Sequence, residues 1–336
     1  MHLLEENMKV CLSVCMCQSA ERKVGLKNVT IPAGSFTRSH DNYFKRQQKL
    51  RGVTVMNITG RTKIIGIFGY PVEHTLSPAM HNAAFEHLGL NYCYLPFLVH
   101  PHALQQAVES VRALSLIGVN TTVPHKESVM PFLDEIGSEA EFIGAVNTIV
   151  NKDGRLTGHN TDGRGFMLSL AEKGVDVSGK KALIIGAGGA SRAISYYLSE
   201  KAAELVIYNR SRERRDALVS DLGRIRTNVS ALERLDGLDG SGGIDQFDLI
   251  VNATPLGLGQ DDPLPFDPAL LREKQVICDL IYKKTALLAA AGKKRCLTVD
   301  GLGMLLYQGV LAFELWTGLP APVAVMKNAL SVRMTE

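Results

Sequence analysis

The sequence Lys181-Ala-Leu-Ile-Ile185-Gly186-Ala-Gly188-Gly189-Ala-Ser-Arg-Ala193 predicts a strand, a glycine turn and a helix in immediate succession. Its apolar run is rich in β-branched residues, and a helical pattern through Ile194, Tyr197 and Leu198 follows the turn. Glycines allow a tight bend and the close approach of a diphosphate, and the amides and dipole of the next helix attract its charge. The stretch therefore predicts a dinucleotide-binding turn at Gly186, Gly188 and Gly189, with an ordinary strand-to-helix turn as the simpler alternative.

A second strand, Glu204-Leu-Val-Ile-Tyr208, follows about twenty residues later, as a dinucleotide-binding unit requires. At its end an NAD site would place Asp or Glu for the ribose diol, but this chain has Asn209-Arg210-Ser211 and then Arg212 and Arg214. Arginines without a carboxylate favour a 2′-phosphate, so the sequence predicts NADP. The simpler alternative is a solvated, basic start of a helix.

Length and composition indicate an ordinary α/β protein with two domains. The chain has 336 residues, which is enough for two separate cores. Residues 1–58 carry nine Lys/Arg and four Asp/Glu, which leaves 28 and 30 for the rest, so the body is close to neutral. We therefore expect neither a nucleic-acid nor a membrane partner, and no apolar run approaches the roughly 20 residues of a spanning helix.

Cysteines and histidines show no metal-binding pattern. The six cysteines have neither zinc spacing nor the arrangement of a disulfide framework, and the nine histidines form no paired motif. We predict no metal and a reducing, cytoplasmic location. Residues 1–58 show no clear periodicity, and Met56 stands just before the first convincing strand, so we expect a disordered extension or a misassigned start.

The first strand, Lys63-Ile-Ile-Gly-Ile-Phe-Gly69, leads through a loop to a helix predicted to start at Pro78. Ser77 suits the N-cap position, and exposed hydroxyl groups at a helix start also suit a carboxylate ligand. Capping alone would explain Ser77, but it does not explain Thr75.

Polar residues follow an apolar strand in Leu116-Ile-Gly118-Val-Asn120-Thr-Thr122-Val-Pro124-His-Lys126. The carboxyl edge of a parallel sheet is where open α/β sheets bind ligands, so Asn120, Thr122 and Lys126 are expected to converge. A lysine in the first turn of a helix is unfavourable for the helix dipole and should have another partner. The alternative is a simply solvated lysine.

A hairpin is predicted over residues 144–162, because Asn151-Lys-Asp153-Gly154 is a strong turn signal. It projects Asn147 from one arm and ends the other at Asp162. Asp162 could equally cap the next helix, which is expected over residues 163–173. A domain boundary is predicted near residue 163.

Two later stretches complete the candidate site. The strand Phe247-Asp-Leu-Ile-Val-Asn252 breaks into polar residues, and its position places Asn252 and Thr254 toward the nicotinamide ribose. In a helix after Asp300, Gln308 shares a face with apolar residues. A buried amide must be hydrogen-bonded, so Gln308 should touch a ligand or a fixed backbone group.

Together these stretches resemble the shikimate dehydrogenase family over residues 62–330. The resemblance rests on the order and spacing of seven segments: Thr75-Leu-Ser77-Pro78, residues 118–126, Ala145-Val-Asn147-Thr148, Asn160-Thr-Asp162-Gly163, Gly186-Ala-Gly188-Gly189-Ala190, Asn209-Arg210-Ser211, and Asp300-Gly-Leu-Gly303-Met304-Leu-Leu-Tyr-Gln308. The resemblance implies reversible reduction of 3-dehydroshikimate to shikimate with NADPH, in aromatic amino-acid biosynthesis.

The resemblance also assigns roles to individual residues. It implies that Ser77 and Thr75 take the substrate carboxylate and that Lys126 and Asp162 form the catalytic pair. It implies that the hydroxyl groups of the substrate are bound by Asn120, Asn147, Asp162 and Gln308, with Thr122 and Tyr282 as further pocket contacts. The residues expected to contact the cofactor are Gly186, Gly188, Gly189, Ala190, Asn209, Arg210, Ser211, Arg214, Asn252, Thr254, Gly301 and Met304.

One departure from the family pattern keeps alternatives open, because Thr75 stands where the family commonly has a serine. Its extra methyl group could alter discrimination between shikimate and quinate, so a broader quinate/shikimate dehydrogenase that accepts NAD is the closest rival. A non-catalytic NADP or shikimate sensor would be expected to lose the Lys and Asp pair, which this chain retains. An unrelated reductase of larger substrates does not explain the converging polar residues.

The predicted architecture is therefore α/β with two domains. Residues 1–58 form the extension, residues 59–162 the shikimate-binding catalytic domain, completed by residues 308–336, and residues 163–307 the Rossmann NADP-binding domain. The C-terminal helix is expected to pack back on the first domain. The expected partner is a small-molecule substrate, and the chain is expected to be a monomer or homodimer.

Overall fold

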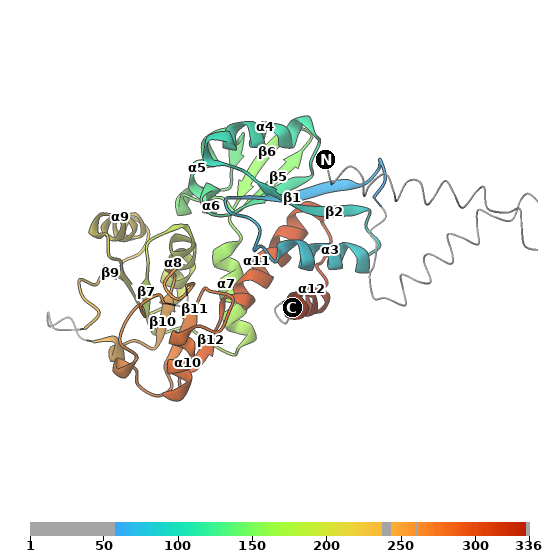
Figure 1. Cartoon of the computed structure of the whole chain (residues 1–336). Helices are drawn as coiled ribbons and strands as arrows, with labels where there is room; N and C mark the ends of the chain where they lie inside the picture. Colours follow the sequence, from blue (N-terminus) through green and yellow to red (C-terminus); the bar gives the residue numbers. More distant parts are fainter. Residues whose placement is uncertain (1–57, 237–242, 260, 334–336) are drawn as a thin grey trace, which may run out of the picture. The chain divides into compact units, whose positions relative to one another are not determined.

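The computed structural model describes residues 58–236, 243–259 and 261–333, and Figure 1 shows their helices and strands. The described residues belong to one compact unit that begins at Ile58. The predicted extension, residues 1–58, lies outside the described residues except for Ile58 itself. Two six-stranded sheets, each covered by helices, organise the described chain.

The first sheet has the strand order β2-β1-β3-β5-β6-β4. Strand β1 pairs in parallel with β2 and β3, whereas the hairpin of β5 and β6 joins β3 antiparallel. The sheet is therefore mixed, because the predicted hairpin reverses the chain. The strands are β1 Lys63–Gly69, β2 Tyr92–Leu98, β3 Gly118–Thr121, β4 Glu135–Ile136, β5 Thr148–Lys152 and β6 Arg155–His159.

Helices cover both faces of this sheet. Side chains of α3, α11 and α12 pack on one face around Ile65, Ile67 and Tyr94, and those of α4 pack on the other around Val119 and Ile149 (Figure 1). The helices of this part are α3 Ser77–His87, α4 Leu104–Ala113, α5 His125–Ser128 and α6 Ser138–Ile143, with α11 Gly301–Thr317 and α12 Val323–Arg333 from the end of the chain.

The second sheet has the order β12-β11-β10-β7-β8-β9, and all its pairs are parallel. This is the doubly wound order of dinucleotide-binding folds, in which the chain starts in the middle at β7 and extends to each side in turn. The elements are β7 Lys181–Ile185, β8 Glu204–Tyr208, β9 Val229–Ala231, β10 Leu249–Asn252, β11 Val276–Asp279 and β12 Leu297–Val299, with α7 Asp162–Glu172, α8 Gly189–Lys201, α9 Arg212–Gly223 and α10 Ala286–Lys293.

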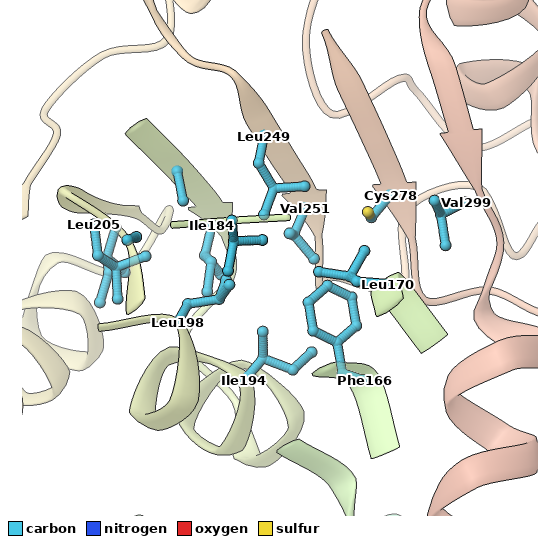
Figure 2. Close-up of a cluster of buried hydrophobic side chains, with 14 of the residues drawn as sticks. Phe166, Leu170, Ile184, Ile194, Leu198, Leu205, Leu249, Val251, Cys278 and Val299 are labelled. Carbon is cyan, nitrogen blue, oxygen red and sulfur yellow. The ribbon is translucent and has the colours of Figure 1, made fainter. Parts of the chain in front are cut away.

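Strand β7 shows why this sheet is buried on both sides. Successive side chains of a strand point to opposite faces. Ile184 packs with Phe166 of α7 and Ile194 of α8, as Figure 2 shows, whereas Ile185 packs in a separate cluster with Leu287 of α10. The continuous apolar run of β7 is thus the signature of a central strand covered by helices on both faces.

Helix α11 takes part in the cores of both sheets. Met304 belongs to the cluster of the second sheet, whereas Leu305 and Phe313 belong to that of the first. Met326 of α12 packs in the same cluster as Leu305, so the C-terminal helix packs on the first sheet, as predicted. The two-part α/β fold is confirmed, and the exact division of the chain at residues 58, 162 and 307 stays a prediction.

Several element boundaries differ from the prediction by one to three residues. The apolar run from Cys93 to Val99 predicts a strand, and β2 is observed one residue earlier at each end, from Tyr92 to Leu98. Strand β10 begins at Leu249, two residues after the predicted Phe247. The apolar run Val276-Ile-Cys-Asp-Leu-Ile-Tyr282 predicts a strand, but β11 ends at Asp279, so Leu280, Ile281 and Tyr282 lie in a loop. Such shifts arise because apolar loop residues that enter the core continue the pattern of a strand.

Candidate active site

A cavity of about 220 Å³ gathers residues that are far apart in the sequence. All nine residues predicted to contact the substrate line this cavity, which we call the polar pocket. They are Thr75, Ser77, Asn120, Thr122, Lys126, Asn147, Asp162, Tyr282 and Gln308. Ala190, Gly301 and Met304, which were predicted to contact the cofactor, line it too. The fold brings these side chains together, and the role of each one stays a prediction.

Lys126 and Asp162 form an ion pair inside the polar pocket. Lys126 Nζ lies 2.6 Å from Asp162 Oδ2, and the side chains are 21% and 5% exposed. Lys126 stands in the first turn of α5, and Asp162 is the first residue of α7. The alternative of a simply solvated lysine is therefore wrong, because the Asp162 carboxylate is the partner of the Lys126 ammonium group.

Asp162 is held on both sides of its carboxylate. Oδ1 accepts a hydrogen bond from Asn147 Nδ2 at 2.9 Å, and the Asp162 backbone N–H donates to Asn160 Oδ1 at 3.0 Å. Helix α7 begins at Asp162, with Thr161 as its N-cap and no capping bond from a side chain. The alternative that Asp162 caps this helix is therefore wrong, because its carboxylate is occupied by Lys126 and Asn147.

Asn147 links Asp162 to Gln308. Its Nδ2 also donates to Thr161 Oγ1 at 2.9 Å and lies 3.5 Å from Gln308 Oε1. Gln308 Nε2 in turn donates to the backbone oxygen of Leu305 at 2.8 Å, so the buried Gln308 amide touches a fixed backbone group, as expected. The network holds the carboxylate and the amide at fixed places in the pocket wall.

A close helix contact sets the position of Gln308. A Cβ added to Gly165 of α7 would lie 2.6 Å from the backbone nitrogen of Gln308. No larger residue fits there without displacing backbone, so glycine lets α7 and α11 approach. The contact brings Gln308 to the same end of α7 as Asp162.

Helix α3 begins one residue earlier than predicted. Ser77 is its first residue, Leu76 is the N-cap, and no side chain makes a capping bond. The capping role of Ser77 is therefore wrong. The Ser77 backbone N–H instead donates to Thr75 Oγ1 at 3.4 Å, which places both hydroxyl groups at the edge of the pocket.

Asn120 projects from the end of β3, and its amide is fully oriented. Nδ2 donates to the backbone oxygen of Asn147 at 2.9 Å and to Thr148 Oγ1 at 3.0 Å. Oδ1 accepts from the hydroxyl group of Tyr94 at 2.7 Å. Sequence reasoning missed Tyr94 and Thr148. The one available signal for Tyr94 was a hydroxyl-bearing ring in an otherwise apolar strand, because such a hydroxyl needs a partner when buried.

Tyr282 lines the pocket near the ion pair. Its side chain is 43% exposed, yet desolvation inside the pocket raises the pKa of its hydroxyl group, with Lys126 opposing that effect and Asp162 adding to it. A raised pKa keeps the hydroxyl protonated, so Tyr282 can donate a hydrogen bond to a ligand. The electrostatic influence of both charged residues supports the predicted place of Tyr282 beside them.

The glycine turn has the geometry that a diphosphate requires. Gly186 has φ of +123°, and a Cβ there would lie 2.9 Å from the backbone oxygen of Ala253. Helix α8 begins at Gly189 with Gly188 as its N-cap, and a Cβ at Gly188 would meet no atom within 4 Å. The backbone N–H groups of this helix start are therefore accessible to a bound anion.

Asn252 and Thr254 lie beside the turn and are tied to a buried carboxylate. Asn252 Nδ2 donates to Asp279 Oδ1 at 3.1 Å, and Asn252 Oδ1 accepts from Thr254 Oγ1 at 2.6 Å. Burial raises the pKa of Asp279, and hydrogen bonds from Thr285, the Ile281 amide and Asn252 oppose that rise. Asp279 thereby fixes the loop after β10, another partner that sequence reasoning missed.

The arginines after β8 differ in their surroundings. Arg212 pairs with Glu233 at 3.4 Å, and Ser211 caps α9 by accepting from the Arg214 backbone at 3.4 Å. Arg210 and Arg214 are exposed, and neither makes an ion pair with another described residue. Asn209 Nδ2 bonds the backbone oxygen of Ser211 at 2.9 Å and shapes the same turn. Two guanidinium groups thus remain available to a phosphate.

A larger cavity, of about 400 Å³, is lined by Glu139, His159, Arg164 and Glu314 among others. Neither Lys126 nor Asp162 lines it, so we place the chemistry in the smaller polar pocket. Among the described residues, no group of three or more His, Cys, Asp or Glu side chains could hold a metal ion. No helix in the described ranges is long and apolar enough to span a membrane.

Three family models match successive parts of the chain. They are the shikimate dehydrogenase substrate binding domain at residues 67–149, the shikimate/quinate 5-dehydrogenase model at residues 169–256 and the shikimate 5′-dehydrogenase C-terminal domain at residues 301–330. Fold and pocket define a dinucleotide-binding α/β protein with a second, ligand-binding part. The chain belongs to the shikimate dehydrogenase family.

The match with this chain covers almost the whole length of individual relatives. A shikimate dehydrogenase (NADP⁺) of Desulforamulus reducens is 49% identical over 286 residues, 83% of this chain and 98% of the relative. The structure of a Thermus thermophilus shikimate 5-dehydrogenase with NADP(H) and shikimate is 38% identical, with a TM-score of 0.73 over 80% of this chain and 99% of that one. A Listeria monocytogenes enzyme in complex with shikimate and NAD is 39% identical, with a TM-score of 0.75 over 82% and 99%.

Proposed function

We propose that this protein is an NADP-dependent shikimate dehydrogenase, which reversibly reduces 3-dehydroshikimate to shikimate in the biosynthesis of aromatic amino acids. The observation that carries the proposal is the Lys126–Asp162 ion pair, 2.6 Å long, in a pocket lined by seven further predicted substrate contacts. A ketone flanked by hydroxyl groups and a carboxylate needs such a set of donors and acceptors. The relatives named above support the same activity.

The two ends of the pocket suit the two ends of the substrate. We assign the substrate carboxylate to the hydroxyl groups of Ser77 and Thr75 at the start of α3, where the helix dipole favours negative charge. The ring hydroxyls fall to the oriented amides and the carboxylate: Asn120, Asn147, Gln308 and Asp162. Thr122 and Tyr282 complete the wall.

Lys126 and Asp162 are the catalytic pair of this proposal. NADPH, when bound, supplies the hydride. Reduction of a ketone builds negative charge on its oxygen, and the Lys126 ammonium can stabilise that charge and deliver a proton to it. Asp162 holds Nζ in place, and in the reverse direction the pair takes the proton from the substrate hydroxyl.

The cofactor fits the residues of the second sheet. We assign the diphosphate to the helix start at Gly186, Gly188, Gly189 and Ala190, and the adenosine phosphate to Asn209, Arg210, Ser211 and Arg214. Asn252, Thr254, Gly301 and Met304 would border the nicotinamide end, since Gly301 and Met304 line the polar pocket.

A broader quinate/shikimate dehydrogenase is the nearest alternative. Thr75, which carries a methyl group that serine lacks, lines the pocket at the end assigned to the substrate carboxylate, and one neighbour of similar structure was solved with NAD. The free guanidinium groups of Arg210 and Arg214 favour NADP over NAD in this chain. A non-catalytic sensor is disfavoured, because the Lys126–Asp162 pair is complete.

Cellular location and assembly are further parts of the proposal. Cys93, Cys278 and Cys296 are free and buried, which suits the reducing cytoplasm. A monomer or homodimer is proposed, and light scattering of the purified protein would distinguish the two.

The decisive experiment is a steady-state assay of the purified protein with shikimate or quinate, each combined with NADP⁺ or NAD⁺. A strong preference for shikimate with NADP⁺ supports the proposal. Comparable turnover with quinate or NAD⁺ would assign the broader specificity. Absence of turnover with every pair would reject an enzymatic role and favour the sensor.

A further inference from the structure

Tyr94 lies behind the polar pocket and does not line it, yet it contacts Asn120, which does. The Tyr94 hydroxyl group donates to Asn120 Oδ1 at 2.7 Å. The two residues stand on different strands, β2 and β3. One buried hydroxyl group thus helps to orient a side chain assigned to a ring hydroxyl of the substrate.

The Tyr94 ring cannot easily move. It is 1% exposed, and it stacks on the buried His81 ring with centroids 4.5 Å apart and planes at 11°. The Tyr94 backbone is held as well, because Asn82 Oδ1 accepts from the Tyr94 backbone N–H at 2.7 Å and Asn82 Nδ2 donates to the Tyr94 backbone oxygen at 3.0 Å. Burial raises the pKa of the hydroxyl group, so the group remains a donor.

The hydrogen bond from Tyr94 decides what Asn120 can offer to a ligand. Both N–H groups of the Asn120 amide are used by Asn147 and Thr148, and one lone pair of Oδ1 is used by Tyr94. A carbonyl-type oxygen has two lone pairs, so a single acceptor position remains. Asn120 is therefore set to accept a hydrogen bond from a substrate hydroxyl and not to donate to a carbonyl or carboxylate.

We propose that Tyr94 is a positioning residue of the shikimate pocket, whose hydroxyl group orients the Asn120 side-chain oxygen as a hydrogen-bond acceptor for the substrate. This inference rests on the proposed function. Loss of the hydroxyl leaves the Asn120 amide held through Nδ2 alone, with nothing behind Oδ1 to orient it toward the substrate. Shikimate binding should weaken, while Lys126, Asp162 and the cofactor site keep their geometry.

The test compares Tyr94→Phe with Tyr92→Phe in the same strand. The Tyr92 ring packs on Phe85 with centroids 5.3 Å apart, and its hydroxyl group makes no hydrogen bond among the described residues. Tyr94→Phe should raise KM for shikimate about tenfold, as expected for one lost buried hydrogen bond, with kcat changed less than about threefold and KM for NADP⁺ unchanged. Tyr92→Phe should leave all three at wild-type values.

A double-mutant cycle separates positioning from general stability. Calorimetry measures the factor by which Tyr94→Phe raises the dissociation constant of shikimate. This factor should be at least threefold smaller in an Asn120→Ala background than in the wild-type background. An equal rise in both backgrounds, or an unchanged KM in Tyr94→Phe, would overturn the proposal. If Tyr94→Phe does not fold, 4-aminophenylalanine in place of Tyr94 retains a donor and should restore wild-type KM, and failure to restore it also counts against the role. No turnover by the wild-type protein would instead reject the function itself.

Discussion

At the scale of single residues, Asp162 holds the site together. One carboxylate oxygen meets Lys126 at 2.6 Å and the other meets Asn147 at 2.9 Å, so neither partner can rotate without breaking a bond to a buried charge. Asn147 Nδ2 donates hydrogen bonds to Thr161 and Asp162. Asn147 therefore supports the carboxylate in addition to being a candidate substrate contact. The pair is therefore oriented before any substrate arrives.

Lys126→Ala should lower kcat by about 10² to 10⁴, the usual contribution of general acid–base catalysis, with little change in the dissociation constant of NADP⁺. The reason is that, among the described residues that line the polar pocket, Nζ is the one cationic donor next to Asp162. Steady-state kinetics and cofactor titration of the variant measure both quantities. Lys152→Ala, which changes an exposed lysine on the hairpin, is the matched control and should behave as wild type. Near-normal turnover of Lys126→Ala would contradict the assignment of Lys126 and Asp162 as the catalytic pair.

Arg214→Gln should weaken NADP⁺ without affecting NAD⁺, because only NADP⁺ carries the phosphate that this guanidinium group would bind. Loss of one charge-assisted contact should raise KM for NADP⁺ about 10- to 100-fold. Arg212→Gln is the control, since Arg212 already pairs with Glu233 at 3.4 Å. The ratio of kcat/KM for the two cofactors is the measurement. A parallel loss with NAD⁺ would show that Arg214 supports the fold of this turn and not the phosphate.

At the scale of elements, the packing of α7 on α11 carries the site as much as the sheets do. Asp162 opens α7, Gln308 lies in α11, and the contact at Gly165 brings their backbones together. Two helices from distant parts of the chain thereby place a carboxylate and an amide against Asn147 of the hairpin. The geometry of the pocket depends on the closeness of this helix pair.

Gly165→Ala should therefore displace Gln308, because its Cβ would lie 2.6 Å from a backbone nitrogen that cannot rotate away. We expect a loss of about 1–3 kcal/mol in the free energy of unfolding, as for other overpacked sites, together with a higher KM for shikimate. Denaturant titration and kinetics measure the two effects. Gly223→Ala is the matched control, since that helical glycine has no atom within 4 Å of an added Cβ. Equal stability of the two variants would mean that the helices are free to separate.

Most elements could be predicted because their signals are local. Strand β8 was predicted at its observed limits, and the glycine turn was recognised from the strand and helix on each side. The mistaken caps at Ser77 and Asp162 share one cause: each helix begins at that residue, one position earlier than predicted, so Leu76 and Thr161 stand at the N-cap positions. A shift of one residue at a helix start is not visible in the sequence pattern.

The support of the site could not be predicted from local signals. Tyr94 and Asn120 are 26 residues apart, on strands that are not neighbours in the sheet. Asp279, which holds Asn252, likewise reads as part of an apolar strand. Motifs identify residues at strand ends, where ligands bind, whereas the buried residues behind them resemble ordinary core.

At the scale of the whole molecule, stability and the site share a core. His81 of α3 is 0% exposed and contacts the rings of Tyr94 and Trp316, and neither of its ring nitrogens has a hydrogen-bond partner among the described residues. Burial lowers the pKa of His81 to about 3. The folded protein therefore keeps this ring neutral at pH values where an unfolded chain protonates it.

The sign of the resulting pH dependence follows from that lowered pKa. A depressed folded-state pKa gives stability that is present above the unfolded value of about 6.5 and is lost as the pH falls from there toward 3. Between pH 7 and pH 5, His81 alone should reduce the free energy of unfolding by about 2 kcal/mol. His81→Phe removes the titrating group and should flatten this part of the curve, whereas His87→Gln, on the exposed side of the same helix, should keep it. Urea titrations at both pH values measure the difference, and an equally steep loss in His81→Phe would mean that the acid sensitivity arises elsewhere in the molecule.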